Sequence, residues 1–388
     1  MALQPGSKGD NRAGGFFVFG HYSAVANHEA LTTGRAPFYS APVEILRSGP
    51  GRTGTKATAS TVTSLARVTQ LVQSELNEVE QRIIKQATAF DPAIEGYVTY
   101  AIGGRGKRLR PLVGLLAGGA TGQIDTGHID LGVIIELIHV ATLVHDDIMD
   151  EAERRRAQPT VNARWGNSLS VLLGDCLFAH ALTLSTNFEN ADISRAIART
   201  ASEICSGEMI QTQRRFDLKL EVEDYLRIVE MKTGSLFAAA AELGATISQA
   251  DARSIEILKT FGMRIGTAYQ IYDDCLDIAG SEGATGKTLG TDLRKGKFTL
   301  PILIFLRSAS EFERERSCSL ILEGKCDEVS QLLKNGAGNG AMTEAIATAN
   351  DLIRTAQAGI KALRPNPHTE GLLGLGDALR DMLKQIRG

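Results

Sequence analysis

Two five-residue segments far apart in the chain share the pattern Asp-Asp-x-x-Asp, at residues 146–150 and 273–277. On a helix, side chains four residues apart lie on one face, with Cβ atoms about 5–6 Å apart. The carboxylates at the first and fifth positions of each segment would repel each other unless a cation neutralised them. Oxygen ligands of this kind suit Mg²⁺, which commonly bridges carboxylates to substrate phosphates. The sequence therefore predicts a shared magnesium site with the ligands Asp146, Asp147, Asp150, Asp273, Asp274 and Asp277.

Basic residues follow both acidic segments and support this interpretation. One acidic triplet at this spacing would carry little weight, because about 0.6 are expected by chance in a chain with 45 Asp and Glu among 388 residues. Arg154–Arg156 follow the first segment, however, and Lys287, Lys295 and Lys297 follow the second. Such cations suit a substrate with more negative charge than the metals neutralise, as an organic diphosphate has. The alternative is that the arginines form exposed pairs with nearby glutamates, each worth about 0–1 kcal/mol.

A third basic segment, Gly103–Pro111, precedes the first acidic segment. Its glycines lead into a predicted helix start, where Pro111 fits the first turn. Backbone N–H groups at a helix N-terminus favour phosphate, as do the cations Lys107 and Arg110. The segment predicts an anion site, and the alternative is a solvated basic loop.

The composition is that of a soluble globular protein, with 43% hydrophobic and 22% charged residues. A net charge of −3 gives no general attraction to nucleic acid, so phosphate binding must be local. The five cysteines form no Cys-x-x-Cys motif and indicate reduced thiols in a cytoplasmic protein. We expect no transmembrane segment, because even the apolar stretch Leu131–Val144 is interrupted by polar residues. The N-terminus lacks the pattern of a secretory signal.

From Thr61 onward, hydrophobic residues recur with the spacing of amphipathic helices. Long helical segments are expected at 131–150, 168–188, 193–215, 222–247, 252–279 and from 301 onward, with polar or glycine-rich joints at 187–194, 280–297 and 335–340. No convincing alternating strand occurs among them. We therefore predict an all-α fold, a large antiparallel helical bundle with its site in the interior. Residues 1–59 lack a sustained period and are expected to form a disordered extension, so the folded domain would span residues 60–388.

Together these residues resemble the trans-isoprenyl diphosphate synthases, also called polyprenyl synthetases, from about Thr61 to Pro301, with a weaker helical tail to Gly388. The likeness rests on landmarks that follow one another in order. They are Gly106-Lys107-Arg108-Leu109-Arg110-Pro111, Glu136-Leu137-Ile138-His139, His145 through Glu151, Arg155-Arg156, Gly174-Asp175, Gly207-Glu208-x-x-Gln211, Lys232-Thr233-Gly234, Tyr269 through Asp277, Gly286-Lys287 and Gly296-Lys297.

The resemblance implies an isoprenoid-synthase bundle around a deep central cavity, with the acidic segments facing each other across its mouth. About three Mg²⁺ ions would clamp the diphosphate of an allylic substrate and activate it as a leaving group. The family pattern assigns Arg155, Lys232, Lys287 and Lys297 to that diphosphate, and Gly106, Lys107, Arg110, His139 and Arg156 to isopentenyl diphosphate. Thr233 and Gln270 match positions that stabilise the allylic cation. The family expectation for assembly is a homodimer.

The implied reaction is prenyl transfer, in which the double bond of isopentenyl diphosphate captures the allylic cation and loss of a proton restores an alkene. No protein nucleophile is required, and the departing diphosphate accepts the proton. Two residues depart from the family pattern, since Arg105 and Ala157 each replace a glycine. Both are expected to lie in loops and to cause small shifts in substrate affinity.

Product length depends on the residues just before the first acidic segment. Aromatic residues at the fifth or fourth position before the first Asp restrict family members to short chains, whereas this chain has Ala141 and Thr142. Small side chains leave a tunnel open, with Ile138 as a later floor, although a bulky residue on another helix, such as Phe178, could close it earlier. We expect a product of about six to ten isoprene units, a quinone side-chain precursor greasy enough to favour peripheral delivery to a membrane.

Other functions remain as alternatives. A farnesyl or geranylgeranyl diphosphate synthase would make a shorter product with the same chemistry. A noncatalytic subunit of a heteromeric synthase would predict damaged acidic segments, and both are intact. A metal-dependent phosphohydrolase that used His145-Asp146 as a metal doublet would leave the second acidic segment unexplained. A terpene cyclase would not need the second diphosphate pocket.

Overall fold

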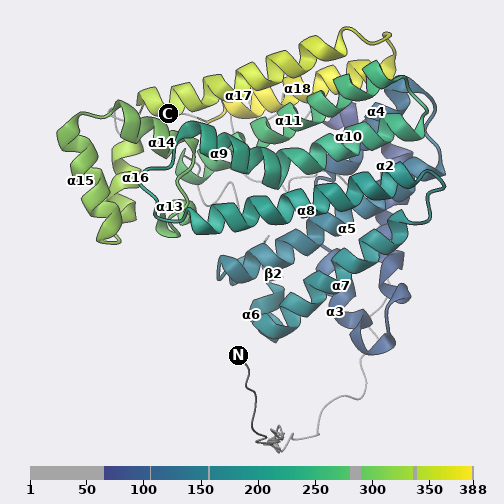
Figure 1. Cartoon of the computed structure of the whole chain (residues 1–388), viewed down its shortest axis with the longest axis horizontal. Coiled ribbons are helices and arrows are strands. Elements are labelled where there is room, and N and C mark those ends of the chain that lie inside the picture. The colour runs from purple at the N-terminus through teal and green to yellow at the C-terminus, as the bar shows by residue number, and fades with distance from the viewer. Residues whose placement is uncertain (1–64, 105, 156–157, 280–289, 335–338, 387–388) are drawn as a thin grey trace, which may run out of the picture. The chain divides into compact units, whose positions relative to one another are not determined.

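The computed structural model describes residues 65–104, 106–155, 158–279, 290–334 and 339–386. In these ranges the chain forms helices joined by short loops, together with one short hairpin (Figure 1). The all-α fold class is confirmed. The predicted extension at residues 1–59 lies outside the described residues.

The elements follow in this order along the chain. The first are α2 (Gln73–Lys85), η1 (Gln86–Ala89), α3 (Pro92–Ile102), α4 (Leu109–Thr121), α5 (Thr126–Met149), β1 (Arg154–Arg155), β2 (Gln158–Pro159), α6 (Val161–Trp165), α7 (Asn167–Ser185) and α8 (Ala191–Gln213). They are followed by α9 (Val222–Val229), η2 (Glu230–Gly234), α10 (Ser235–Ile247), α11 (Ala252–Ala279), α13 (Thr291–Arg294), α14 (Leu300–Ser308), α15 (Glu311–Leu322), α16 (Cys326–Lys334), α17 (Asn339–Ile360) and α18 (Pro367–Lys384). Helix η1 is a 3₁₀-helix and η2 is a π-helix.

Helix α5 lies in the core of the bundle. It packs against α2, α4, α7 and α10, and every residue from Leu131 to Ile138 is buried. Asp125 caps its first turn by accepting a hydrogen bond from the backbone N–H of His128 at 3.3 Å. A helix that is apolar all round is stable only inside a core. This packing fixes the position of the first acidic segment, which ends the helix.

Two of the described helices, α5 and α7, reach the length and mean hydropathy of a membrane-spanning segment. The average hydropathy tolerates isolated polar residues such as Glu136, which interrupt a continuous apolar run. In α5, 72% of the apolar window is buried, so its place in the core accounts for its composition. In α7 the buried share is 33%, and Val171 and Leu172 are exposed.

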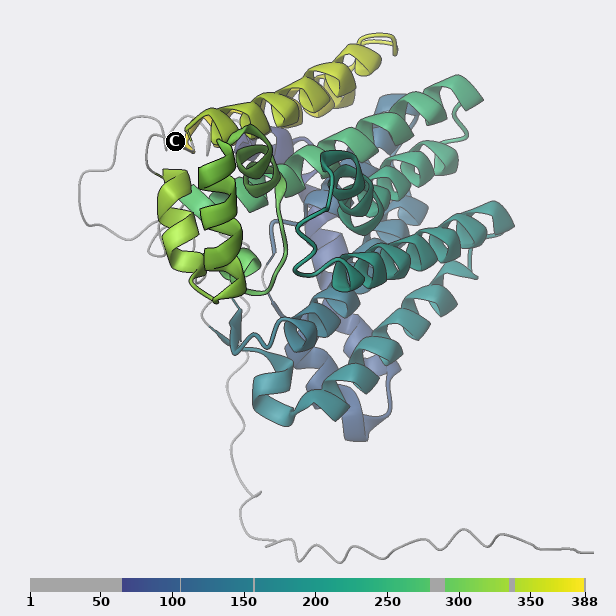
Figure 2. The same cartoon turned by 60° about the vertical axis from the view of Figure 1, so that its left-hand side comes forward.

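Helix α11 carries the second acidic segment and packs between α10 and α17 (Figures 1 and 2). Only residues 248–251 join α10 to α11, so the two helices are antiparallel neighbours. Their close approach requires Gly262, because a Cβ there would lie 2.3 Å from the carbonyl oxygen of Phe237. Packing on two sides holds α11, and with it the second acidic segment, in place.

Most predicted helices are present, with two local differences. Helix α11 has the predicted bounds, Ala252–Ala279. The segment predicted as one helix at 222–247 is interrupted by the π-helix η2. The hairpin of β1 and β2 was not predicted, since each strand has two residues, too few for an alternating pattern. Its antiparallel register pairs Arg154 with Pro159.

Candidate active site

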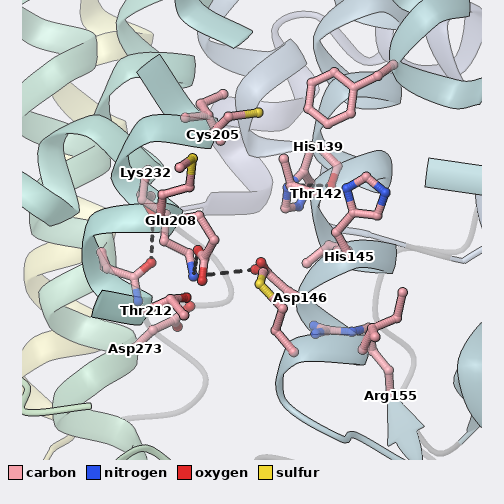
Figure 3. A pocket seen from close by; sticks show the side chains of 18 of the residues that line it. His139, Thr142, His145, Asp146, Arg155, Cys205, Glu208, Thr212, Lys232 and Asp273 are labelled. Atoms are coloured by element: carbon pink, nitrogen blue, oxygen red, sulfur yellow. Dashed lines mark hydrogen bonds and ion pairs between the residues drawn. The ribbon is translucent and has the colours of Figure 1, made fainter. Parts of the chain in front are cut away.

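A cavity of about 710 Å³ is lined mainly by α5, α7, α8, η2 and α11 (Figure 3). Nine of the predicted site residues line it: Arg110, His139, Thr142, Asp146, Arg155, Lys232, Thr233, Gln270 and Asp273. Figure 3 shows Asp146 and Asp273 extending from different helices, with Lys232 and Glu208 beside them. The fold therefore brings both acidic segments and several predicted cations to one space.

The second carboxylate of the first acidic segment is held by the hairpin. Asp147 is 5% exposed and accepts from Arg155, with Nη2 to Oδ1 at 2.7 Å and Nε to the two oxygens at 2.9 and 3.1 Å. Burial raises the pKa of Asp147, and the guanidinium of Arg155 opposes that shift. This bidentate pair fixes Arg155, a predicted diphosphate ligand, at the cavity wall.

Asp150, the fifth residue of the first acidic segment, is surrounded by cations. Lys297 Nζ donates to its two oxygens at 2.7 and 2.9 Å, and Arg215 Nη2 lies 3.3 Å from Oδ1. Lys295 Nζ lies 4.0 Å from the same oxygen. Burial alone would raise the pKa of Asp150, but Lys297 and the other cations lower it below its ordinary value. Arg215 was missed from the sequence, where its only signal is its charge at the end of a helix.

The π-helix η2 brings Lys232 and Thr233 to the cavity wall. π-turns inside helices often occur at functional sites because the wider turn re-aims side chains. Lys232 Nζ forms an ion pair with Glu208, donates to Gln211 Oε1 at 3.0 Å, and lies 3.5 Å from Asp146 Oδ2. Burial alone would lower the pKa of Lys232, but Asp146 and Glu208 raise it above its ordinary value. A charged ammonium therefore stands beside the first acidic segment.

In the second acidic segment, Asp273 lines the cavity whereas Asp274 is held by neighbouring side chains. Asp274 is 5% exposed, and its two oxygens accept from Tyr225 Oη at 2.5 Å and Gln270 Nε2 at 2.8 Å. Burial raises the pKa of its carboxyl group. Asp274 thus bridges Tyr225 and Gln270, as Asp147 pairs with Arg155.

The fifth residue, Asp277, is fixed by the start of α13. It accepts from Thr291 Oγ1 and from the backbone N–H of Asp292, each at 3.3 Å. Asp292 was missed from the sequence. The pKa of Asp292 is raised to about 6, chiefly by burial and also by the charge of Asp277, while Lys297 opposes the rise. Asp292 is far from residues 146–150 in the sequence, so the sequence did not indicate that it lies near Asp150.

The carboxylates fit a metal that is shared with substrate. Among the described residues, no three His, Cys, Asp or Glu side chains gather closely enough to hold a metal by themselves. The cavity-lining carboxylates Asp146 and Asp273 instead belong to two helices, α5 and α11. Mg²⁺ keeps several waters and is usually bound by one or two carboxylates together with substrate phosphates. Such a divided oxygen donor set fits Mg²⁺ bound together with a diphosphate.

The predicted anion segment reaches the cavity through Arg110. Its guanidinium lies 4.6 Å from the centre of the Phe237 ring, and its buried Nε has no hydrogen-bond partner among the described residues. Burial lowers its pKa. Gly106 is half-buried and Lys107 is exposed, and neither is among the lining residues, whereas His139 is. The predicted ligands Arg156 and Lys287, like the departures Arg105 and Ala157, lie outside the described residues.

Arg108 ties this segment to two helices. It is 9% exposed, and its guanidinium donates to Glu80 Oε2 at 2.6 Å in α2 and to Glu136 Oε1 at 2.5 Å in α5. Its backbone has a left-handed φ of 48°. Burial alone would lower the pKa of Arg108, but the two carboxylates raise it above its ordinary value. Arg108 therefore anchors the segment that carries Lys107 and Arg110.

The apolar part of the cavity bears on product length. Of the residues predicted to control it, Thr142 lines the cavity, whereas Ala141 and Ile138 are fully buried in the core and are not lining residues. Phe178 of α7 also lines the cavity, with its ring 6.2 Å from that of His145. The described wall at this depth is therefore formed by Thr142 and by side chains from α7 and α8.

Comparisons with known proteins show which family this chain is similar to. The sequence profile of the family described as polyprenyl synthetase matches residues 91–335. The octaprenyl diphosphate synthase of Escherichia coli is 30% identical over 313 residues, 80% of this chain and 97% of the relative. The crystal structure of a decaprenyl diphosphate synthase from Rhodobacter capsulatus has a TM-score of 0.74 and 31% identity, covering 84% of this chain and 100% of that one.

A second solved structure resembles this chain and contains ligands. The polyprenyl synthase of Caulobacter crescentus, complexed with calcium and isoprenyl diphosphate, has a TM-score of 0.70 and 31% identity, covering 85% of this chain and 99% of that one. The family profile spans more than half of this chain, and the Escherichia coli relative is matched over nearly its whole length. The chain belongs to the polyprenyl synthetase family.

Proposed function

We propose that this protein is a Mg²⁺-dependent prenyltransferase that condenses isopentenyl diphosphate with an allylic diphosphate to make a long-chain trans-polyprenyl diphosphate. The observation that carries this proposal is the meeting of Asp146 and Asp273 at one cavity whose lining also includes the apolar residues Leu143, Val171 and Phe178. Activation of a diphosphate leaving group and room for a growing hydrocarbon are needed together. The octaprenyl and decaprenyl synthases among the relatives support a long product.

Of the six predicted Mg²⁺ ligands, Asp146 and Asp273 line the cavity and would hold the metal together with Asp150 and Asp277. The other two, Asp147 and Asp274, are engaged by Arg155 and by Tyr225 with Gln270. When bound, the metal neutralises charge that builds up on the departing diphosphate. Lys232 and Arg155 line the same wall as Asp146 and would bind the allylic diphosphate directly, together with Lys297 and Lys287. These fixed cations stabilise the leaving group without reorganisation during the reaction.

The second substrate would bind on the side of Arg110 and His139. The guanidinium of Arg110 is desolvated, which strengthens its attraction for a diphosphate, and Gly106, Lys107 and Arg156 would complete the isopentenyl diphosphate site. The alkene then attacks the allylic cation, a carbon–carbon bond forms, and the departing diphosphate accepts the released proton. Thr233 and Gln270 would present oxygen dipoles to the cation.

The direct test incubates the purified protein with Mg²⁺, isopentenyl diphosphate and farnesyl or geranylgeranyl diphosphate, and measures product length by chromatography. We expect products of about six to ten isoprene units. Products ending at three or four units would contradict the long-chain assignment but leave prenyl transfer intact. Release of phosphate without chain growth would contradict prenyl transfer itself.

Substitutions at Thr142 test whether this part of the cavity limits product length. Replacing Thr142 with Phe is expected to shorten the product by several units, because the ring would enter the cavity beside Phe178. The size-matched variant Thr142→Val should keep the original product length. Replacing Phe178 with Ala should lengthen the product. If Thr142→Phe left the length distribution unchanged, the floor would have to lie on other residues.

We propose further that the protein acts as a homodimer in the cytoplasm and releases its product to a membrane surface. The support for the dimer is the family resemblance, and Leu172 of α7, which is 64% exposed and is not a lining residue of the cavity, is a candidate contact residue. Sedimentation is expected to show a dimer, and Leu172→Glu should shift it toward monomer; a wild-type monomer would contradict the assignment.

A further inference from the structure

Four side chains form a continuous hydrogen-bonded row that ends at the cavity. Tyr225 Oη donates to Asp274 Oδ2 at 2.5 Å, Gln270 Nε2 donates to Asp274 Oδ1 at 2.8 Å, and Thr233 Oγ1 donates to Gln270 Oε1 at 2.9 Å. Thr233 and Gln270 line the cavity, whereas Tyr225 and Asp274 do not. The row therefore begins at Tyr225, which is buried between α9 and α11, and ends at the cavity wall that would face the substrate.

The direction of these hydrogen bonds sets the polarity at the cavity wall. A glutamine amide has a donor end and an acceptor end of similar size, so its neighbours decide which end faces which way. The carboxylate of Asp274 accepts from the amide NH₂, which leaves Gln270 Oε1 on the side of Thr233. Thr233 donates its hydroxyl proton to Gln270 Oε1, so the lone pairs of Thr233 Oγ1 remain available toward the cavity. Both oxygens thus present negative ends of dipoles where an allylic cation would form.

Tyr225 completes the arrangement by holding the other oxygen of Asp274. Tyr225 is 4% exposed, and its hydroxyl donates to Asp274 Oδ2 at 2.5 Å. Without this donor, Asp274 Oδ2 would be a buried acceptor with an unfilled hydrogen-bonding requirement. Asp274 would then be free to rotate, and the amide of Gln270 would lose its fixed direction.

We propose that Tyr225 and Asp274 are positioning residues that act through Gln270, by fixing its amide so that the oxygens of Gln270 and Thr233 stabilise the allylic cation. This inference rests on the proposed prenyltransferase function. It assigns a role to Tyr225, which belongs to none of the sequence landmarks of the family quoted above. It also gives the second residue of the second acidic segment a task other than direct metal binding.

The test is a double-mutant cycle on the full-length protein. Tyr225→Phe is expected to lower kcat about 5- to 20-fold with KM for both substrates within about twofold, because the effect concerns the transition state rather than substrate binding. In a Gln270→Ala background, Tyr225→Phe should cause no further loss, since the residue through which it acts is gone. A kcat loss of the same size in both backgrounds would overturn the proposal.

Two further variants keep the outcome interpretable. Tyr97→Phe removes a phenol hydroxyl from α3, at a residue that does not line the cavity, and is expected to leave kcat unchanged; an equal loss there would contradict a specific role for Tyr225. Asp274→Asn keeps the size of the side chain but can donate as well as accept, so it should lower kcat in the same way, and it serves if Tyr225→Phe fails to fold. Wild-type protein without prenyl transfer would refute the proposed function, whereas active wild type with an unaffected Tyr225→Phe variant would refute only this inference.

Discussion

Replacing Asp273 with Asn is expected to lower kcat by about 10²- to 10³-fold, the range seen when one preorganised group that stabilises transition-state charge is removed. Asp273 lines the cavity from α11, as Asp146 does from α5. The amide keeps the size of the side chain but removes the charge that would hold Mg²⁺. We therefore also expect the Mg²⁺ concentration needed for half-maximal rate to rise.

The measurement is initial rate against Mg²⁺ concentration at saturating substrates. Asp274→Asn should lower kcat without moving the Mg²⁺ dependence, because both oxygens of Asp274 are already engaged by Tyr225 and Gln270. Asp175→Asn is the matched control, since this carboxylate is 63% exposed and lies 3.5 Å from His145. An equal shift in Mg²⁺ dependence for Asp273→Asn and Asp274→Asn would contradict the division of roles within the segment.

The fold was predictable where local pattern and packing agree. The bounds of α11 follow from the spacing of its apolar residues. Helix α11 packs on both α10 and α17, so the residues that are apolar in the sequence are also the residues that are buried. The π-helix η2 has no such signal, since one extra residue in a turn changes the direction of Lys232 and Thr233 without changing composition. The hairpin is similarly determined by tertiary contacts, among them the pair of Arg155 with Asp147.

The site was predictable to the level of residue type and helical face. Spacing places the first and fifth carboxylates of each segment together, but it does not show what the second carboxylate meets. That partner is Arg155 for Asp147, and Tyr225 with Gln270 for Asp274. The position of Ala141 shows the same limit, because one step along a helix turns a side chain by about 100°, from the cavity face of Thr142 into the core.

Replacing Arg108 with Met is expected to reduce the free energy of unfolding by about 3–5 kcal/mol, the cost of leaving buried charges without a partner. Glu136 is 4% exposed and would lose the donor that neutralises it. Glu80, whose side chain is 22% exposed, would lose the same donor. Urea unfolding followed by circular dichroism measures the change. The contrasting variant is Arg195→Met, which breaks an ion pair whose side chains are 72% and 77% exposed and should cost at most about 1 kcal/mol.

The same substitution separates a structural role of Arg108 from its effect on substrate binding. Lys107 and Arg110 flank Arg108 in the chain, so loss of the anchor should raise KM for isopentenyl diphosphate more than KM for the allylic substrate. Adding Glu136→Gln to Arg108→Met removes the unpaired charge and should recover part of the lost stability, whereas KM should stay high because the segment still lacks its tie to α2 and α5. Recovery of both quantities together would mean that charge burial alone, and not anchoring, links Arg108 to the substrate site.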